Sequence, residues 1–171
     1  MVELWHRFPT GAYPLKTDAT TSSQHFHHGL LGLNDSGQGI SLRRMNIVAH
    51  GIDLVENERI RHVWEQHPDQ FLNRILTPVE RAYCERRKNP VPHIAGRWAA
   101  KEAILKALGT GWRGAIAWTD MEITNDSAGQ PHVSLSGHTR EVAKSLGITR
   151  LLLSITHTEH YAAASAIGLS E

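Results

Sequence analysis

The sequence predicts an α+β fold in which an antiparallel sheet packs against helices. Two observations lead to this prediction. Helical patterns are concentrated between residues 56 and 108, whereas strand patterns are concentrated between 115 and 167. The late strand patterns come in pairs separated by short polar turns, and such turns join antiparallel strands. Each pattern occurs once, so no internal repeat is expected.

Residues 1–44 are predicted to be disordered or loosely structured, and residues 45–171 to form the folded domain. The first segment is rich in Gly, Ser, Thr, Asp and Pro and lacks sustained periodicity, so it cannot bury enough apolar surface to offset chain entropy. Met45 directly precedes the first strand pattern, which leaves a translation start there open. A histidine cluster in the segment comprises His25, His27 and His28. It could bind a metal, although such clusters in flexible tails are more often incidental.

The folded domain is predicted to begin with a strand and two helices. Residues 47–55 are rich in β-branched side chains, which favours a strand, and a short helix over 56–66 opens with an acidic residue. Thr77 and Glu80 form a capping box, and a proline occupies the first helical position between them. This pattern predicts a helix from Thr77 to about residue 87.

A longer helix is predicted over residues 92–108, and Gly109 ends it as a C-cap would. The remaining predicted elements are a strand over 115–124, a strand over 131–135, a helix over 136–146, and strands over 151–156 and 161–167. The turn signals within each strand pair predict two hairpins.

The composition is that of one soluble globular domain of 171 residues, with 40% hydrophobic and 20% charged residues. A formal net charge of +1 provides no global basic field, so no nucleic-acid partner is predicted. No apolar run approaches the roughly 20 residues of a membrane span, so no membrane association is predicted. Cys84 is the only cysteine, which excludes an intrachain disulfide and is compatible with the predicted cytoplasmic location.

The predicted helix over 92–108 carries two charged residues beside its apolar stripe. Glu102 lies at the edge of the stripe, one turn after Trp98, and Lys106 lies one turn further on, outside the stripe. Small alanines next to them would let another group approach closely. The alternative is an ordinary surface Glu–Lys pair, worth only about 0.3–0.5 kcal/mol.

Asp53 is an acid within the mostly apolar first strand, where an unpaired carboxylate is costly to bury. Alternation along the strand places it on one face with Gly51 and Val55. It could instead face solvent at the strand end or cap the next helix. The functional interpretation pairs Asp53 with Glu102 as oxygen ligands of Mg²⁺, which needs only one or two carboxylates besides water and substrate phosphates.

Further residues suit a phosphate ester. The turn Gly109–Thr110–Gly111 could bring backbone N–H groups near a phosphate, although a glycine after a helix is usually only a C-cap. Arg97 adds positive charge. His157 follows a strand and could accept a proton near neutral pH, or it could be a turn residue without a function.

The motifs together resemble those of a known family, the holo-acyl-carrier-protein synthases, which are the short type of 4′-phosphopantetheinyl transferase. The resemblance covers residues 47–167 and is carried by the segments GIDLVENERI, FLNRILTPVERAYCERRK, IAGRWAAKEAILKALGTG, GQPHVSLSG and SITHTEHYAAASAI. Residues 1–44 have no counterpart in it.

The resemblance implies roles for individual residues. Asp53 and Glu102 match the magnesium ligands of the family, and Lys106 matches a lysine that contacts phosphate. The position of His157 is histidine in some members and aspartate in others. The predicted catalytic residues are Lys106 and His157, and the predicted coenzyme-binding residues are Arg97, Lys106, Gly109 and Gly111.

The activity implied is transfer of 4′-phosphopantetheine from coenzyme A to a serine of apo acyl carrier protein, with release of adenosine 3′,5′-bisphosphate, in support of fatty acid biosynthesis. The expected cofactor is Mg²⁺, and the expected assembly is a homotrimer with active sites between subunits. The general base is left open among His157, a metal ligand and an oriented water. A magnesium-dependent phosphohydrolase or nucleotidyl transferase could use the same two acids, and a non-catalytic binding domain is the third alternative.

Acyl carrier proteins are acidic, and this chain is almost neutral, so docking of the carrier requires a local basic patch. The candidate residues are Arg59, Arg61, Arg86, Arg87 and Lys88. A run of basic residues at the end of a helix is, however, more often simply solvated.

Overall fold

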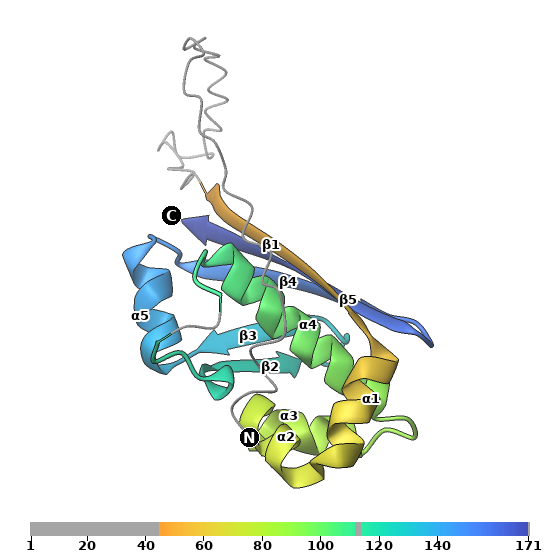
Figure 1. The fold of residues 1–171 in the computed structure, drawn as a ribbon. Coiled ribbons are helices and arrows are strands. Elements are labelled where there is room, and N and C mark those ends of the chain that lie inside the picture. Colours follow the sequence, from red (N-terminus) through yellow and green to blue (C-terminus); the bar gives the residue numbers. More distant parts are fainter. Residues whose placement is uncertain (1–44, 112–113, 171) are drawn as a thin grey trace, which may run out of the picture. The chain divides into compact units, whose positions relative to one another are not determined.

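The computed structural model describes residues 45–111 and 114–170 (Figure 1). The expectations for residues 1–44, including the histidine cluster, lie outside these ranges and stay predictions. The elements are β1 (Asn46–Glu56), α1 (Asn57–Gln66), α2 (Pro68–Ile75), α3 (Pro78–Glu85), α4 (Val91–Ala107), β2 (Met121–Asn125), β3 (Pro131–Leu135), α5 (Gly137–Ser145), β4 (Arg150–His157) and β5 (Tyr161–Ser170).

The strands form two antiparallel sheets, which confirms the α+β fold. The larger sheet has the order β1-β5-β4, and β2 pairs with β3 in the smaller one. Both predicted hairpins, β2–β3 and β4–β5, are present. The sheet order brings the first strand of the domain against the last one, so residues near both ends of the domain share one sheet.

Two boundaries differ from the sequence prediction. The segment after Pro68 forms helix α2, because proline suits the first helical position and Phe71, Leu72 and Ile75 supply a buried stripe. Strand β2 begins at Met121 rather than at residue 115, because a 3₁₀ turn over Trp118–Asp120 precedes it. The sequence analysis thus did not predict α2 and placed the start of β2 too early.

Helix α4 lies across one face of the larger sheet and is buried along most of its length (Figure 1). Glycine at position 51 allows this packing, because a Cβ there would lie 2.1 Å from the carbonyl oxygen of Ala103. Two turns earlier on the same side of the helix, Gly96 packs on Ile155 of β4. The buried residues of α4 extend well beyond the single apolar stripe expected for this helix.

A buried ion pair fixes α4 against the neighbouring helices. Lys101 is fully buried, and its ammonium donates to the Glu80 carboxylate at 2.7 Å and to the carbonyls of Ile75 and Trp118. Glu80 completes the predicted capping box with Thr77. All three ammonium hydrogens thus have acceptors, which is the condition under which a buried charge is tolerated.

Cys84 is buried and has no disulfide partner among the described residues. Burial raises the pKa of its thiol to about 11. No helix in the described ranges is long and apolar enough to cross a lipid bilayer.

Candidate active site

The predicted carboxylates and lysine meet where β1 crosses α4. Lys106 donates to Asp53 Oδ1 at 2.8 Å and to the carbonyl of Ile52 at 3.0 Å. Asp53 faces the helix because alternation along β1 places it on the same side as Gly51, where strand and helix are closest. The lysine side chain is half exposed, whereas that of Asp53 is only 14% exposed.

Glu102 completes this cluster, because it lies near enough to Asp53 for the charge of that acid to affect its pKa. Its pKa is raised above the ordinary value, first because the carboxyl is largely buried and second because of the negative charge of Asp53. The charges of Lys106 and Arg59 oppose this shift. The two carboxylates therefore repel each other, and a bound cation would relieve that repulsion.

The donor set of this cluster fits magnesium. Two carboxylates supply hard oxygen ligands, and Mg²⁺ takes its remaining ligands from water and substrate phosphates. No group of three or more His, Cys, Asp or Glu residues in the described ranges is arranged to hold a metal. Asp53 and Glu102 thus offer sparse ligation of the kind magnesium accepts, unlike the complete protein cage of a structural zinc ion.

The glycine turn after α4 has the conformation of a helix end. Gly109 and Gly111 have φ values of +67° and +57°, which side chains rarely adopt. The N–H of Gly109 donates to the Lys106 carbonyl, and those of Thr110 and Gly111 donate to the Leu105 carbonyl. These donors already serve the C-terminus of the helix, so a role for them in phosphate binding stays a prediction.

Arg97 and His157 lie together in a second place, a cavity of about 180 Å³. Nine residues line it: Tyr83, His93, Gly96, Arg97, Asn125, Gly129, Pro131, Ile155 and His157. The rings of His93 and His157 are in edge-to-face contact, with centroids 4.8 Å apart. None of the lining residues is acidic, so we call this hollow the anion cavity.

Arg97 is the most buried charge of the anion cavity, at 4% exposed. Its guanidinium donates to Asn125 and lies over the Tyr83 ring, but its Nε has no partner among the described residues. Burial lowers the pKa of His93, and the positive charges of His157, Arg87 and Arg97 lower it further. Several like charges gathered without a carboxylate favour an anionic ligand.

The carboxylate cluster and the anion cavity lie at different places along α4 and over different strands of the larger sheet. Residues Ala103 and Ala107 pack on β1 beside Asp53, whereas Gly96 packs on β4 beside His157. Arg97 and Glu102 are five residues apart, which places them about 140° apart around the helix. Within one chain, the structure therefore does not bring His157 or Arg97 to Lys106.

Sequence reasoning missed several residues of the anion cavity. Tyr83, His93 and Asn125 come from three elements, and none belongs to a motif with an obvious chemical role. Arg87, predicted for carrier docking, lies with its guanidinium 4.3 Å from the centroid of the Tyr83 ring. It therefore borders the cavity as well as the surface.

Comparison with known proteins places this arrangement in a family. A family model described as the 4′-phosphopantetheinyl transferase superfamily matches residues 49–165. The chain belongs to this superfamily. The match includes both the carboxylate cluster and the anion cavity, and it excludes the first 48 residues.

Individual members of the superfamily are similar over nearly their whole length. Holo-[acyl-carrier-protein] synthase of Koribacter versatilis is 46% identical over 121 residues, which are 71% of this chain and 97% of that protein. The enzyme of the same name from Protochlamydia amoebophila is 47% identical over 120 residues, 70% of this chain and 96% of that protein.

Solved structures in the superfamily have the same fold. Holo-ACP-synthase from Plasmodium yoelii superposes with a TM-score of 0.67 at 31% identity, covering 75% of this chain and 99% of that one. The Helicobacter pylori holo-[acyl-carrier-protein] synthase, solved in complex with coenzyme A, gives a TM-score of 0.62 at 31% identity, covering 70% of this chain and 98% of that one.

Proposed function

We propose that this chain is a holo-acyl-carrier-protein synthase. It transfers 4′-phosphopantetheine from coenzyme A to a serine of apo acyl carrier protein, releases adenosine 3′,5′-bisphosphate, and so supports fatty acid biosynthesis. The observation that carries this proposal is the cluster of Asp53, Glu102 and Lys106 within a chain of this superfamily. Relatives at 46–47% identity carry the same enzyme name.

Asp53 and Glu102 would hold a magnesium ion, and the ion when bound offsets the negative charge of the coenzyme A diphosphate. Lys106 supplies a second positive charge. Its ammonium donates to Asp53, and its side chain is half exposed. The long side chain can therefore rotate to reach a phosphate oxygen without breaking a fully buried contact. Such an ammonium stabilises charge that develops on the leaving phosphate.

The anion cavity would take a phosphate at the other end of coenzyme A, together with part of its adenosine. The orphaned Nε of Arg97 is a donor that a phosphate oxygen could satisfy. His93 and Tyr83 offer aromatic surface beside it. We therefore propose binding roles for Arg97 and His157 in this cavity. The further proposal that His157 moves a proton requires that it also reach the attacking serine.

One coenzyme A would then reach both places only if two subunits combine. Within a chain the two places lie apart along α4 and over different strands, whereas a neighbouring chain can bring its anion cavity beside the carboxylates. The outer face of the larger sheet offers an interface, because Ile52, Leu54 and Tyr161 there are 61%, 65% and 45% exposed. A contiguous apolar patch of this kind marks an interaction site. We propose a homotrimer built on this face.

The acidic carrier would approach near the carboxylates. Arg59 lies on α1, close enough to Glu102 for its charge to lower the pKa of that acid. Arg61, two residues further along the helix, has a side chain that is 41% exposed and pairs with Glu58 at 3.3 Å. We propose that these arginines steer the carrier toward the site. Action on a cytoplasmic carrier and coenzyme also suits a chain with a single cysteine.

The test is mass spectrometry of an apo acyl carrier protein incubated with coenzyme A, Mg²⁺ and this protein. The expected result is a carrier heavier by one phosphopantetheine arm, with loss of transfer when EDTA removes the metal. Asp53→Ala and Glu102→Ala should each lower turnover by at least about a hundredfold. Hydrolysis of coenzyme A without a carrier would support a phosphohydrolase instead. Binding of both substrates without any mass gain would support a non-catalytic domain.

A further inference from the structure

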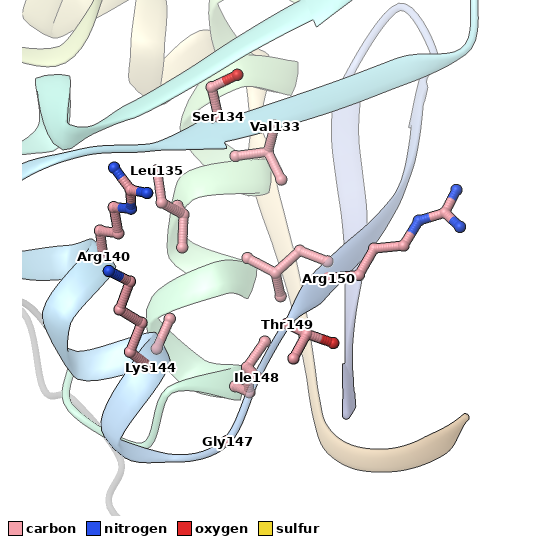
Figure 2. Close-up of a pocket in the computed structure, with 11 residues that line it drawn as sticks. Val133, Ser134, Leu135, Arg140, Lys144, Gly147, Ile148, Thr149 and Arg150 are labelled. Atoms are coloured by element: carbon pink, nitrogen blue, oxygen red, sulfur yellow. The ribbon is translucent and has the colours of Figure 1, made fainter. Parts of the chain in front are cut away.

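An open groove of about 610 Å³ lies between β3, α5 and the start of β4 (Figure 2). Its floor is apolar and includes Val133, Leu135, Ile148 and Leu151. None of its lining residues contributes to either place described above. The proposed transfer reaction therefore leaves this groove without a role.

The rim of the groove is strongly cationic. Arg140 and Lys144 on α5 and Arg150 on β4 line it, and no acidic residue does. This is a local excess of three positive charges in a chain whose formal net charge is +1. No hydrogen bond or ion pair of these three side chains occurs within the described ranges.

Arg140 and Lys144 are one helical turn apart on the same face of α5, and both are exposed. Like charges at this spacing repel each other. An anion bound between the two side chains would offset this repulsion. In Figure 2 both side chains lie on the α5 side of the groove, while Arg150 extends away on the opposite side. Arg140 and Lys144 are therefore the two side chains placed to bind one anionic group together.

The backbone N–H groups at the turn after α5 are not available to bind an anion. The N–H groups of Gly147, Ile148 and Thr149 already donate to the carbonyls of Lys144, Ala143 and Leu169. The Thr149 hydroxyl also donates to the Leu169 carbonyl. Anion binding must therefore come from the side chains of the rim, and the floor can contribute only apolar contact.

We propose that this groove binds a single-chain amphiphile with an anionic head group, of which a long-chain fatty acid is the simplest example. The carboxylate pairs with Arg140 and Lys144, and the acyl chain covers the floor formed by Val133, Leu135 and Ile148. A volume of about 610 Å³ is within the roughly 300–1,000 Å³ of ordinary small-molecule sites. A small inorganic anion would leave the apolar floor uncovered, and a neutral amphiphile would leave the cations unpaired.

The test is isothermal titration of the full-length protein with laurate, kept below its micelle concentration. Laurate should bind with one site per chain, whereas dodecanol and inorganic phosphate should bind much more weakly. The double variant Arg140→Gln/Lys144→Gln should bind laurate roughly tenfold more weakly, because it loses two exposed ion pairs. The double variant Arg61→Gln/Lys88→Gln removes two charges elsewhere and should bind normally.

Three outcomes would overturn the proposal. Equal binding of laurate and dodecanol would show that the rim plays no part, and phosphate binding as tightly as laurate would indicate a simple anion site. Unchanged laurate binding by the Arg140→Gln/Lys144→Gln variant would place the ligand elsewhere. If that variant does not fold, the amide chemical shifts of Gly147 and Ile148 in the wild-type protein test the site instead. They should change when laurate is added, and unchanged shifts would place the ligand elsewhere. Because laurate binding is measured without coenzyme A or carrier, the result does not depend on the proposed transferase activity.

Discussion

Glu102, which we propose as a magnesium ligand, carries a cost in stability. The pKa of its carboxyl is raised by burial and by the charge of Asp53, so the folded chain binds this proton more tightly than the unfolded chain does. The contribution of this group to stability is therefore present below the ordinary carboxyl pKa and is lost as the pH rises through the raised value. At neutral pH the ionised carboxylate destabilises the metal-free fold.

Glu102→Gln should therefore raise the melting temperature of the metal-free protein by a few degrees at pH 7, while it abolishes magnesium-dependent transfer. The gain should shrink as the pH is lowered toward 4, where the wild-type carboxyl is protonated. Thermal melting followed by circular dichroism across this range measures it. Glu65→Gln, an exposed acid on α1, is the matched control and should change neither property. A lower melting temperature for Glu102→Gln would contradict the assigned repulsion.

The two neighbouring arginines after α3 should have different functions. Arg87 stacks on Tyr83 at the anion cavity, whereas Arg86 is exposed and donates to the carbonyl of Ala82. Arg87→Gln should raise the KM for coenzyme A about two- to fivefold, the range of one exposed cation–π contact. Arg86→Gln should instead raise the KM for the carrier and weaken its salt dependence. Steady-state kinetics with each substrate varied would refute this division if both variants altered the same constant.

At the scale of elements, α4 organises the whole site, and Lys101 fixes the helix in place. Because Lys101 and Glu80 are both fully buried, removing one partner leaves an uncompensated charge in the core. We expect Lys101→Met to lower the free energy of unfolding by about 3–5 kcal/mol. Urea unfolding measures this, and failure of the variant to fold would agree with it.

The double variant Lys101→Met/Glu80→Gln should recover part of that loss, because it buries no unpaired charge. Lys88→Met at an exposed position should change the unfolding free energy by less than about 0.5 kcal/mol. A Lys101→Met chain as stable as the wild type would show that the ion pair does not hold α4 in place.

At the scale of the molecule, the outer face of the larger sheet is the interface that we propose for the trimer. Ile52 and Leu54 point away from α4, so their exposure cannot be relieved within one chain. Leu54→Glu should turn the proposed trimer into monomers in light scattering and lower turnover at the same time. Val79→Glu, an exposed apolar position on α3, should leave both unchanged. A fully active monomer would overturn the proposed site between subunits.

The proposed domain boundary can be tested by truncation. A chain beginning at Met45 retains the complete family match over residues 49–165. We expect it to fold with a similar melting temperature and to transfer the arm at a similar rate. Lost solubility or activity, measured against the full-length protein under the same conditions, would show that residues 1–44 contribute to the domain.

The sequence by itself determined the α+β class, both hairpins and the residues of the carboxylate cluster. These features depend on local patterns, because alternation gives Asp53 its face of the strand and helical spacing relates Glu102 to Lys106. The motif order also indicated the family.

Only the tertiary structure decided the rest. The anion cavity joins Tyr83, His93 and Asn125 from three separate elements, and local periodicity cannot indicate which distant segments will meet. The sequence did not reveal the burial of Lys101 for a related reason: a helix covered around most of its circumference has too narrow a polar face for a sequence pattern to orient it. The separation of the two places likewise follows from packing, since β5 lies between β1, which carries Asp53, and β4, which carries His157.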